Sequence, residues 1–158
     1  MSFTFQDVQQ AYERIRPYVR QTPLEESFYL GGEGRRYFFK LESLQRAKSF
    51  KIRGAVNKML TLTDDERKRG VATISSGNHG SSVSYAASLL GIQAVRVIVP
   101  ESTPRSKVER IHYFGAEVLQ MGRDYDEAHA LGMAYIRSGG MTYIDPYYDD
   151  PLIYAGQG

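Results

Sequence analysis

Residues 70–100 read GVATISSGNHGSSVSYAASLLGIQAVRVIVP, and they contain the pattern that identifies the fold class. The β-branched run over 70–75 predicts a strand, the small apolar residues of 81–90 predict a helix, and 94–100 predicts a second strand. Strands joined by a crossover helix run parallel, because the connection returns the chain to the same end of the sheet. The stretch therefore predicts a βαβ unit.

The same alternation continues toward the C-terminus. The expected elements are a helix over 104–114, a strand over 117–121, a helix over 125–138 and a strand over 141–144. Gly91, Gly115 and Gly139-Gly140 follow helical segments where a left-handed cap is needed, and Pro104 suits a first helical turn. We expect an α/β protein with an open, twisted parallel sheet and helices on both faces.

Three elements are expected before residue 70. Thr4 and Asp7 resemble a capping box that opens an amphipathic helix, which Pro17 perturbs. A glycine-rich turn over 31–34 precedes an aromatic strand over 37–42. A helix over 49–62, capped by Ser49, buries one apolar face, composed of Ile52, Ala55, Val56 and Met59.

Composition narrows the class of protein. The chain has 158 residues, 42% hydrophobic and 24% charged, which suits one soluble globular domain. A formal net charge of +2 with scattered basic residues argues against nucleic-acid and membrane partners. The absence of cysteine excludes disulfides, thiolate zinc sites and a cysteine nucleophile. Without a signal pattern or a membrane-length apolar run, we expect a cytoplasmic protein.

Lys51 is expected in the first turn of its helix, near the positive end of the macrodipole. That position and the neighbouring charge of Arg53 both disfavour the ammonium form, which makes the amine a better nucleophile for a Schiff base. Phe50 has two interpretations, as a core aromatic or as a ring that stacks on a flat ligand.

The loop Ser75-Ser76-Gly77-Asn78-His79-Gly80 lies between a predicted strand and a predicted helix. Free amides at a helix start, two glycines and polar side chains suit an anion such as a carboxylate or phosphate. The loop matches neither the dinucleotide nor the P-loop pattern. An ordinary capped turn remains the alternative interpretation.

Other titratable residues have structural explanations. His79, His112 and His129 lie far apart without cysteines or an i,i+4 pair, so no metal site is predicted. Asp124 and its acidic neighbours complement the dipole at a helix start.

The chain resembles the fold-type II pyridoxal-phosphate enzymes, and most closely the threonine dehydratases, serine dehydratases and serine racemases. Two segments carry the resemblance, Ser49-Phe50-Lys51-Ile52-Arg53-Gly54-Ala55 and Ser75-Ser76-Gly77-Asn78-His79-Gly80. Supporting landmarks occur in order along the chain at 21–24, 104–108, 115–118 and 155–158.

The resemblance implies a role for each candidate residue. Lys51 would hold pyridoxal 5'-phosphate and move protons, Phe50 would stack on its ring, and Asn78 would bond the ring's phenolic oxygen. The substrate carboxylate would be received by Ser75, Ser76, Asn78 and His79, with Ser76 also the acid/base on the face opposite Lys51. The implied reaction is β-elimination from threonine or serine, giving a 2-keto acid and ammonia.

The resemblance also implies a division of the chain. Residues 1–45 and 146–158 would belong to a large domain, and 46–145 would form the small α/β domain. The family's phosphate-binding loop would lie beyond Gly158, so we expect a truncated chain that binds the cofactor poorly, has little or no activity and self-associates as a homo-oligomer.

Two alternatives remain open. The first is a catalytically inactive α/β domain. The second is a serine racemase or β-replacement enzyme, because this fold hosts several reactions. Many threonine dehydratases read Asn-His-Ala-Gln-Gly where this chain has Asn-His-Gly-Ser-Ser over residues 78–82, which leaves the exact substrate open.

Overall fold

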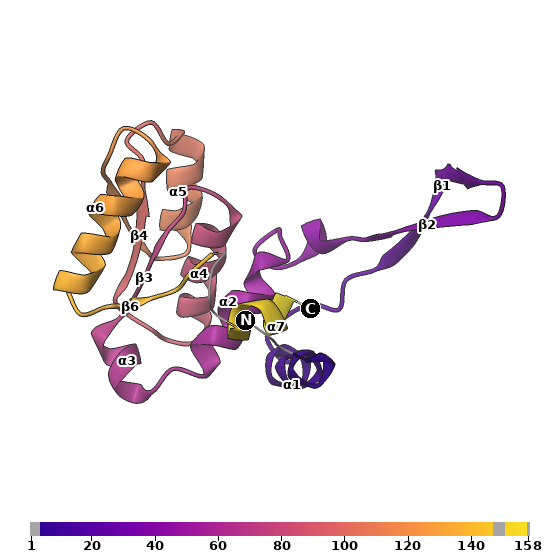
Figure 1. Cartoon of the computed structure of the whole chain (residues 1–158), viewed down its shortest axis with the longest axis horizontal. Helices are drawn as coiled ribbons and strands as arrows, with labels where there is room; N and C mark the ends of the chain where they lie inside the picture. The colour runs from indigo at the N-terminus through magenta and orange to yellow at the C-terminus, as the bar shows by residue number, and fades with distance from the viewer. Residues whose placement is uncertain (1–3, 147–150, 158) are drawn as a thin grey trace.

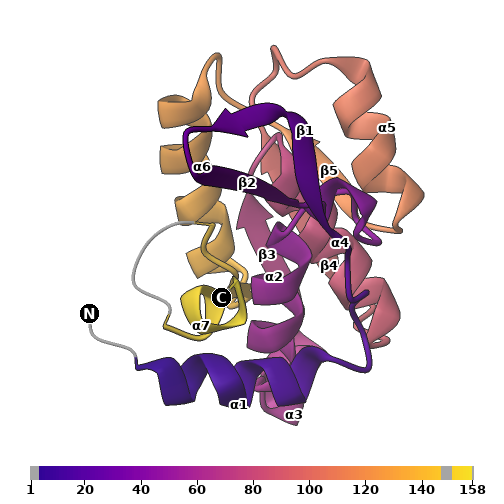
Figure 2. The ribbon, with the colours of Figure 1, turned by 90° about the vertical axis from the view of Figure 1, so that its right-hand side faces the viewer.

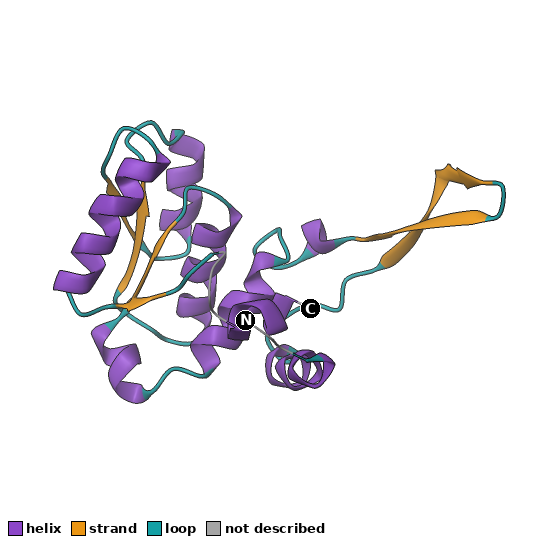
Figure 3. Cartoon of the chain, viewed as in Figure 1, coloured by secondary structure: helices purple, strands orange, loops and turns teal. Residues whose placement is uncertain are grey.

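The computed structural model describes residues 4–146 and 151–157, and at its centre is a four-stranded parallel sheet (Figure 1, Figure 3). The strands are β3 (Val71–Ile74), β4 (Val95–Val99), β5 (Glu117–Gln120) and β6 (Thr142–Tyr143). Their order is β5-β4-β3-β6, and each neighbouring pair is parallel. All of β3 and most of β4 are buried, as expected for strands covered on both faces.

Helices cover both faces of this sheet (Figure 1). They are α2 (Lys51–Leu60), α4 (Asn78–Leu89), α5 (Arg105–Tyr113) and α6 (Tyr125–Ser138). α6 covers one face, where Ile136 packs with Ile74 and Ile98 of the sheet. α4 and α5 cover the other face, and α2 packs on α4. The predicted α/β class and the predicted buried face of α2 are both confirmed.

The N-terminal part leaves the α/β body. α1 (Phe5–Ile15) begins at the predicted capping box of Thr4 and Asp7. β1 (Leu24–Gly32) and β2 (Arg35–Lys40) then form an antiparallel hairpin that projects away from the sheet (Figure 1). Phe28 is 100% exposed and Tyr29 97% exposed on this hairpin.

A short C-terminal helix, α7 (Pro151–Gln157), packs on α2 and α1 (Figure 2). The two helices α2 and α7 approach closely through Gly54 and Gly156. A Cβ on Gly54 would lie 2.7 Å from the Ile153 carbonyl oxygen, and one on Gly156 would lie 2.6 Å from the Asn57 Cβ. Asn57 also donates to the Leu152 carbonyl oxygen at 2.6 Å. α7 is therefore an integral part of the α2 surface.

Several expected boundaries were wrong. α4 begins at Asn78 instead of Ser81, because Gly77 serves as its N-cap and the polar residues after it are helical. Pro104 is the N-cap of α5 and not a residue of its first turn. Phe50 is the N-cap of α2, although the Ser49 hydroxyl does accept from the Lys51 amide at 3.2 Å.

Four elements were not predicted. One is β1, whose glycines and charged residues obscure the strand pattern. Another is α3 (Asp64–Arg69), which opens with a capping box between Thr63 and Glu66. The others are a short 3-10 helix, η1 (Glu42–Leu44), and α7. The predicted left-handed caps are confirmed at Gly91, Gly115 and Gly140, which have positive φ after their helices. Gly158, the last residue of the landmark over 155–158, lies outside the described residues, as do residues 147–150.

Within the described part of the chain, no helix combines the length and the apolar character that crossing a membrane requires.

Candidate functional site

Lys51 is the first residue of α2, and its side chain is partly buried. Its Nζ donates to the Pro146 carbonyl oxygen at 3.1 Å. Burial lowers the pKa of the Lys51 amine, in the predicted direction. The expected contribution of Arg53 was wrong, because Glu42 neutralises that guanidinium. The amine is thus closer to its uncharged, nucleophilic form than a surface lysine would be.

Phe50 lies beside this amine on the surface. Its side chain is 44% exposed, so the interpretation as a core aromatic was wrong. The Lys51 Nζ lies 5.2 Å from the centroid of the Phe50 ring. An exposed ring next to an amine can offer its face to a flat ligand.

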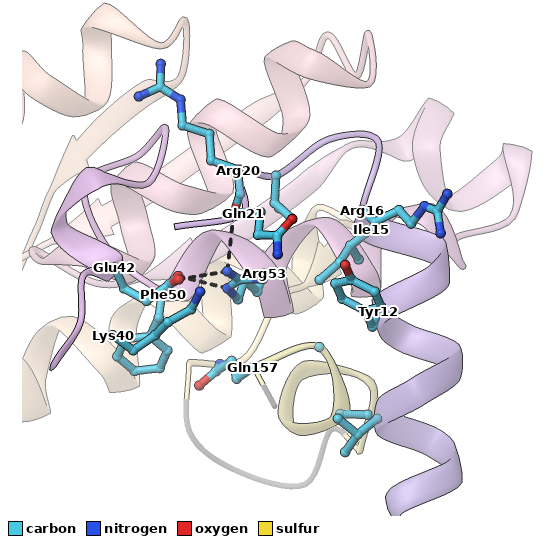
Figure 4. A pocket seen from close by; sticks show the side chains of 14 residues that line it. Tyr12, Ile15, Arg16, Arg20, Gln21, Lys40, Glu42, Phe50, Arg53 and Gln157 are labelled. Atoms are coloured by element: carbon cyan, nitrogen blue, oxygen red, sulfur yellow. Dashed lines mark hydrogen bonds and ion pairs between the residues drawn. The ribbon is translucent and has the colours of Figure 1, made fainter. Parts of the chain in front are cut away.

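A buried ion pair holds the segment before α2 in place. The Arg53 guanidinium binds both carboxylate oxygens of Glu42, at 2.8 Å and 2.7 Å, and both side chains are mostly buried. The Thr22 hydroxyl donates to the same carboxylate at 2.5 Å. Figure 4 shows the bonds from Arg53 to Glu42 and to the Arg20 carbonyl oxygen. Together with the Thr22 contact they tie residues 20–22 to the helix that carries Lys51.

A hollow of about 750 Å³ lies on this side of α2 (Figure 4). Its walls come from α1, α2, α7 and the chain near Lys40 and Glu42. Phe50 and Arg53 line it, whereas Lys51 is absent from its described lining. This hollow is therefore adjacent to the candidate lysine without enclosing its amine.

The second candidate segment is the turn between β3 and α4. Thr4, Thr63 and Asp124 cap their helices with side-chain oxygens, whereas Gly77 supplies no such acceptor to α4. The first amides of α4 thus keep their hydrogen-bonding capacity for an external anion.

The geometry of this turn depends on Gly80. A Cβ at that position would lie 2.3 Å from the Ser75 carbonyl oxygen, so only glycine permits the close approach of α4 to the end of β3. The Ser75 hydroxyl accepts from the Gly77 amide at 3.3 Å and stabilises the turn.

The predicted carboxylate residues differ in exposure. Ser75 and Ser76 are partly exposed, and Asn78 is exposed at the start of α4. All three can therefore be reached by a ligand from solvent. The His79 side chain, by contrast, is only 3% exposed.

The His79 ring faces the interior. Its Nε2 lies 3.1 Å from the Ile144 carbonyl oxygen, and its Nδ1 is buried without a hydrogen-bond partner among the described residues. Burial, the dominant cause, and the charge of Lys51 lower the pKa of His79 to about 4, against opposing effects of the Ile144 carbonyl and Asp145. The ring is neutral at physiological pH and is turned away from solvent.

The two candidate segments meet at one short piece of chain. Ile144, Asp145 and Pro146 follow β6, and in Figure 1 this chain leaves the sheet toward α4 and α2. His79 of the anion turn contacts Ile144, and Lys51 contacts Pro146. Sequence reasoning missed this meeting point, because both acceptors are backbone carbonyls that any residue could supply.

No group of three or more histidine or acidic side chains in the described ranges is arranged to hold a metal ion. The His112 Nδ1 lies 3.1 Å from the Ala116 carbonyl oxygen, which agrees with its predicted structural role. Asp124 caps α6 by accepting from the Glu127 amide at 2.9 Å, as the sequence indicated.

Comparison with known proteins agrees with this geometry. A family model described as "pyridoxal-phosphate dependent enzyme" matches residues 15–158. The catabolic L-threonine dehydratase of Staphylococcus aureus is 38% identical over 154 residues, covering 96% of this chain and 44% of that protein. The L-threonine ammonia-lyase of Geobacter sulfurreducens is 42% identical over 152 residues, covering 96% and 37%.

Among solved structures, maize serine racemase superposes with a TM-score of 0.90 at 32% identity, covering 99% of this chain and 47% of that one. The chain therefore spans less than half the length of each of these three proteins. The match includes the hairpin and both candidate segments, since nearly the whole chain is covered.

Proposed function

The chain belongs to the family of pyridoxal-phosphate dependent enzymes, and on that premise we propose that it supplies the cofactor lysine and the carboxylate turn of a threonine or serine ammonia-lyase. The reaction would be β-elimination of water from a hydroxy amino acid, yielding a 2-keto acid and ammonia. Because the chain spans 44% of the length of the S. aureus dehydratase, the activity is proposed for the whole catalytic unit.

One observation carries the proposal: a partly buried lysine and an uncapped helix start are tied to the same three residues, Ile144 to Pro146. An amine for a carbonyl compound and a place for a carboxylate are what an amino-acid enzyme of this kind requires. A purely structural lysine would instead extend into water, where its charge is stable.

The residues near Lys51 fit the aldehyde end of the cofactor. The lowered pKa of the amine increases its uncharged fraction, which is the form that attacks an aldehyde carbon. The exposed Phe50 ring offers a face for the pyridine ring to stack on. Once bound, the cofactor supplies an electron sink for the charge left at the substrate Cα.

The turn after β3 fits the substrate carboxylate. The first amides of α4 and the hydroxyls of Ser75 and Ser76 would donate to it, and Asn78 would bond the ring's phenolic oxygen. We further propose that the Ser76 hydroxyl exchanges a proton at the face opposite Lys51. His79 was expected to contribute its side chain, and we now assign it only a backbone amide in this turn, because its ring is buried.

Covalent trapping of the cofactor tests the lysine assignment. Pyridoxal 5'-phosphate would be added, reduced with borohydride, and located by peptide mass mapping. We expect the modification to accumulate on Lys51 faster than on exposed lysines such as Lys68, whose side chain is 78% exposed. Lys51→Arg should remove it, and Lys58→Arg serves as the matched control on the same helix. Equal modification of all lysines would contradict the assignment.

Product analysis of the whole catalytic unit tests the reaction. With L-threonine and L-serine we expect 2-keto acid and ammonia. The similarity to maize serine racemase favours racemisation as the second candidate, and formation of D-serine without keto acid would establish it. Absence of both products in a unit that binds the cofactor would point to an inactive domain.

A further inference from the structure

The Ile144 carbonyl oxygen accepts hydrogen bonds from two buried side chains. The Thr73 hydroxyl donates to it at 2.8 Å and the His79 Nε2 lies 3.1 Å from it. Thr73 lies within the buried strand β3, one residue after Ala72, whose carbonyl oxygen accepts the backbone bond from the Ile144 amide. The side chains of Thr73 and His79 thus hold the segment after β6 to β3 and α4, beyond the last backbone hydrogen bond between β3 and β6.

The residues Ile144, Asp145 and Pro146 form what we call the strap. At its far end the Pro146 carbonyl oxygen accepts from the Lys51 Nζ at 3.1 Å. His79 and Lys51 therefore bind carbonyls two residues apart, on a segment with no other element between them. A shift of Ile144 relative to α4 would move Pro146 relative to α2.

The hydrogen-bond chemistry fixes the state of the His79 ring. A carbonyl oxygen can only accept, so Nε2 carries the proton and Nδ1 is a bare acceptor. Protonation of Nδ1 would place a charge in the interior near the Lys51 ammonium, and the favourable effects of the Ile144 carbonyl and Asp145 do not outweigh the cost of burial. The His79 ring is therefore neutral and holds Ile144 through one donated hydrogen bond.

We propose that His79 is a positioning residue that, through the strap, sets where the Lys51 amine lies, instead of binding the substrate with its ring. The importance of this position for the cofactor rests on the proposed function, but the coupling between His79 and Lys51 does not. It follows from three contacts, namely those of Thr73, His79 and Lys51 with the strap.

The proposal has a measurable consequence at Lys51. Its pKa is lowered because the side chain is partly buried against its surroundings, of which the strap is a part. Other charges near this region are those of Asp145 on the strap and Arg53 on α2, the latter paired with Glu42. If the strap loosens, water reaches the amine and the pKa rises toward the ordinary lysine value of 10.5.

Competitive acylation of the 158-residue chain measures the pKa of the Lys51 amine in the absence of cofactor. Acetylation of Lys51 by limiting acetic anhydride, quantified by mass spectrometry across pH, gives the titration midpoint of the amine. We expect His79→Leu to shift the midpoint upward, and His79→Gln, whose amide can still donate, to restore most of the wild-type value. His112→Leu is the matched control, since it removes a histidine-to-carbonyl contact between α5 and Ala116, the residue before β5.

An unchanged Lys51 midpoint in folded His79→Leu would overturn the proposal, and so would an equal shift in His112→Leu. If His79→Leu does not fold, Thr73→Val removes the other donor to Ile144 and should shift the midpoint in the same direction. Nitrogen-15 spectra of the wild-type imidazole provide an independent check, because a ring protonated at Nδ1 would contradict the tie. Trapping of the cofactor at Lys51 can fail while this coupling holds, so the two tests are separable.

Discussion

Arg53 and Glu42 form a two-bonded ion pair between α2 and the residues just before it, with side chains only 14% and 16% exposed. Arg53 lies on α2 two residues after Lys51, and Glu42 lies two residues after the end of β2 at Lys40. Burial alone would raise the pKa of the Glu42 carboxyl, but hydrogen bonds from Arg53 and Thr22 outweigh it, and the pKa is lowered.

Breaking this pair should be costly. Arg53→Met leaves a mostly buried carboxylate without its partner, and we expect a loss of about 2–4 kcal/mol in the free energy of unfolding. Urea unfolding followed by circular dichroism measures it. Arg16→Met is the control, because Arg16 and Glu13 form an exposed pair on α1. Equal effects of the two variants would show that burial of the Arg53 pair contributes little.

Stability should also depend on pH through His79. Its pKa falls from 6.5 to about 4 in the folded chain. Because the unfolded chain binds the proton first, the contribution is complete above pH 6.5 and is lost as the pH falls toward 4. Between roughly pH 6.5 and 5 the loss amounts to about 1.5 kcal/mol. The free energy of unfolding, measured by urea titration at several pH values, should therefore depend less on pH in His79→Gln than in wild type or His112→Gln. An equal pH dependence in all three proteins would contradict a lowered His79 pKa.

Gly80→Ala should distort the anion turn. The added methyl group would collide with the Ser75 carbonyl oxygen, so α4 must move away from β3, at a cost of about 1–3 kcal/mol. Thermal unfolding measures the loss. Gly77→Ala is the matched control, since a Cβ there meets only the Ser75 hydroxyl at 4.0 Å. A fully stable Gly80→Ala chain would mean that the turn adapts without strain.

The hairpin should drive self-association, as the expected homo-oligomer requires. Phe28 and Tyr29 are almost fully exposed, together with half-exposed aromatics of β2, and such a surface is stable in water only when covered. Sedimentation velocity over a range of concentrations should show association that the double variant Phe28→Ser, Tyr29→Ser weakens. Tyr113→Ser, at an 84% exposed aromatic on α5, is the control. A wild-type chain that stays monomeric throughout would refute the expectation.

The sequence was sufficient for the sheet and its crossover helices, because buried parallel strands are continuous apolar runs with clear ends. It was insufficient for β1, since a strand exposed on both faces has no apolar alternation to detect. α3 could have been found, because Thr63 and Glu66 are spaced as a capping box. The start of α4 was misplaced because glycine, asparagine and histidine are weak helix formers that tertiary contacts override.

Some parts of the candidate site could likewise be predicted from the sequence and others could not. Residue type and position made Lys51 and the turn after β3 candidates, and the family resemblance gave them their expected roles. The strap was not, because its acceptors are backbone carbonyls. Nor could the orientation of His79 be read from its neighbours, since the Ile144 carbonyl that holds it lies 65 positions further along the chain.

The hydrogen bond that binds the Lys51 amine joins residues far apart in the sequence. Pro146, which binds its amine, is 95 positions downstream, as is Leu152 relative to Asn57 on the same helix. Contacts of such long range form slowly, because a large loop must close first. During refolding Lys51 should thus behave as an ordinary lysine until α7 and the strap dock, and pulsed amine labelling would reveal it as one of the last lysines to acquire its native reactivity.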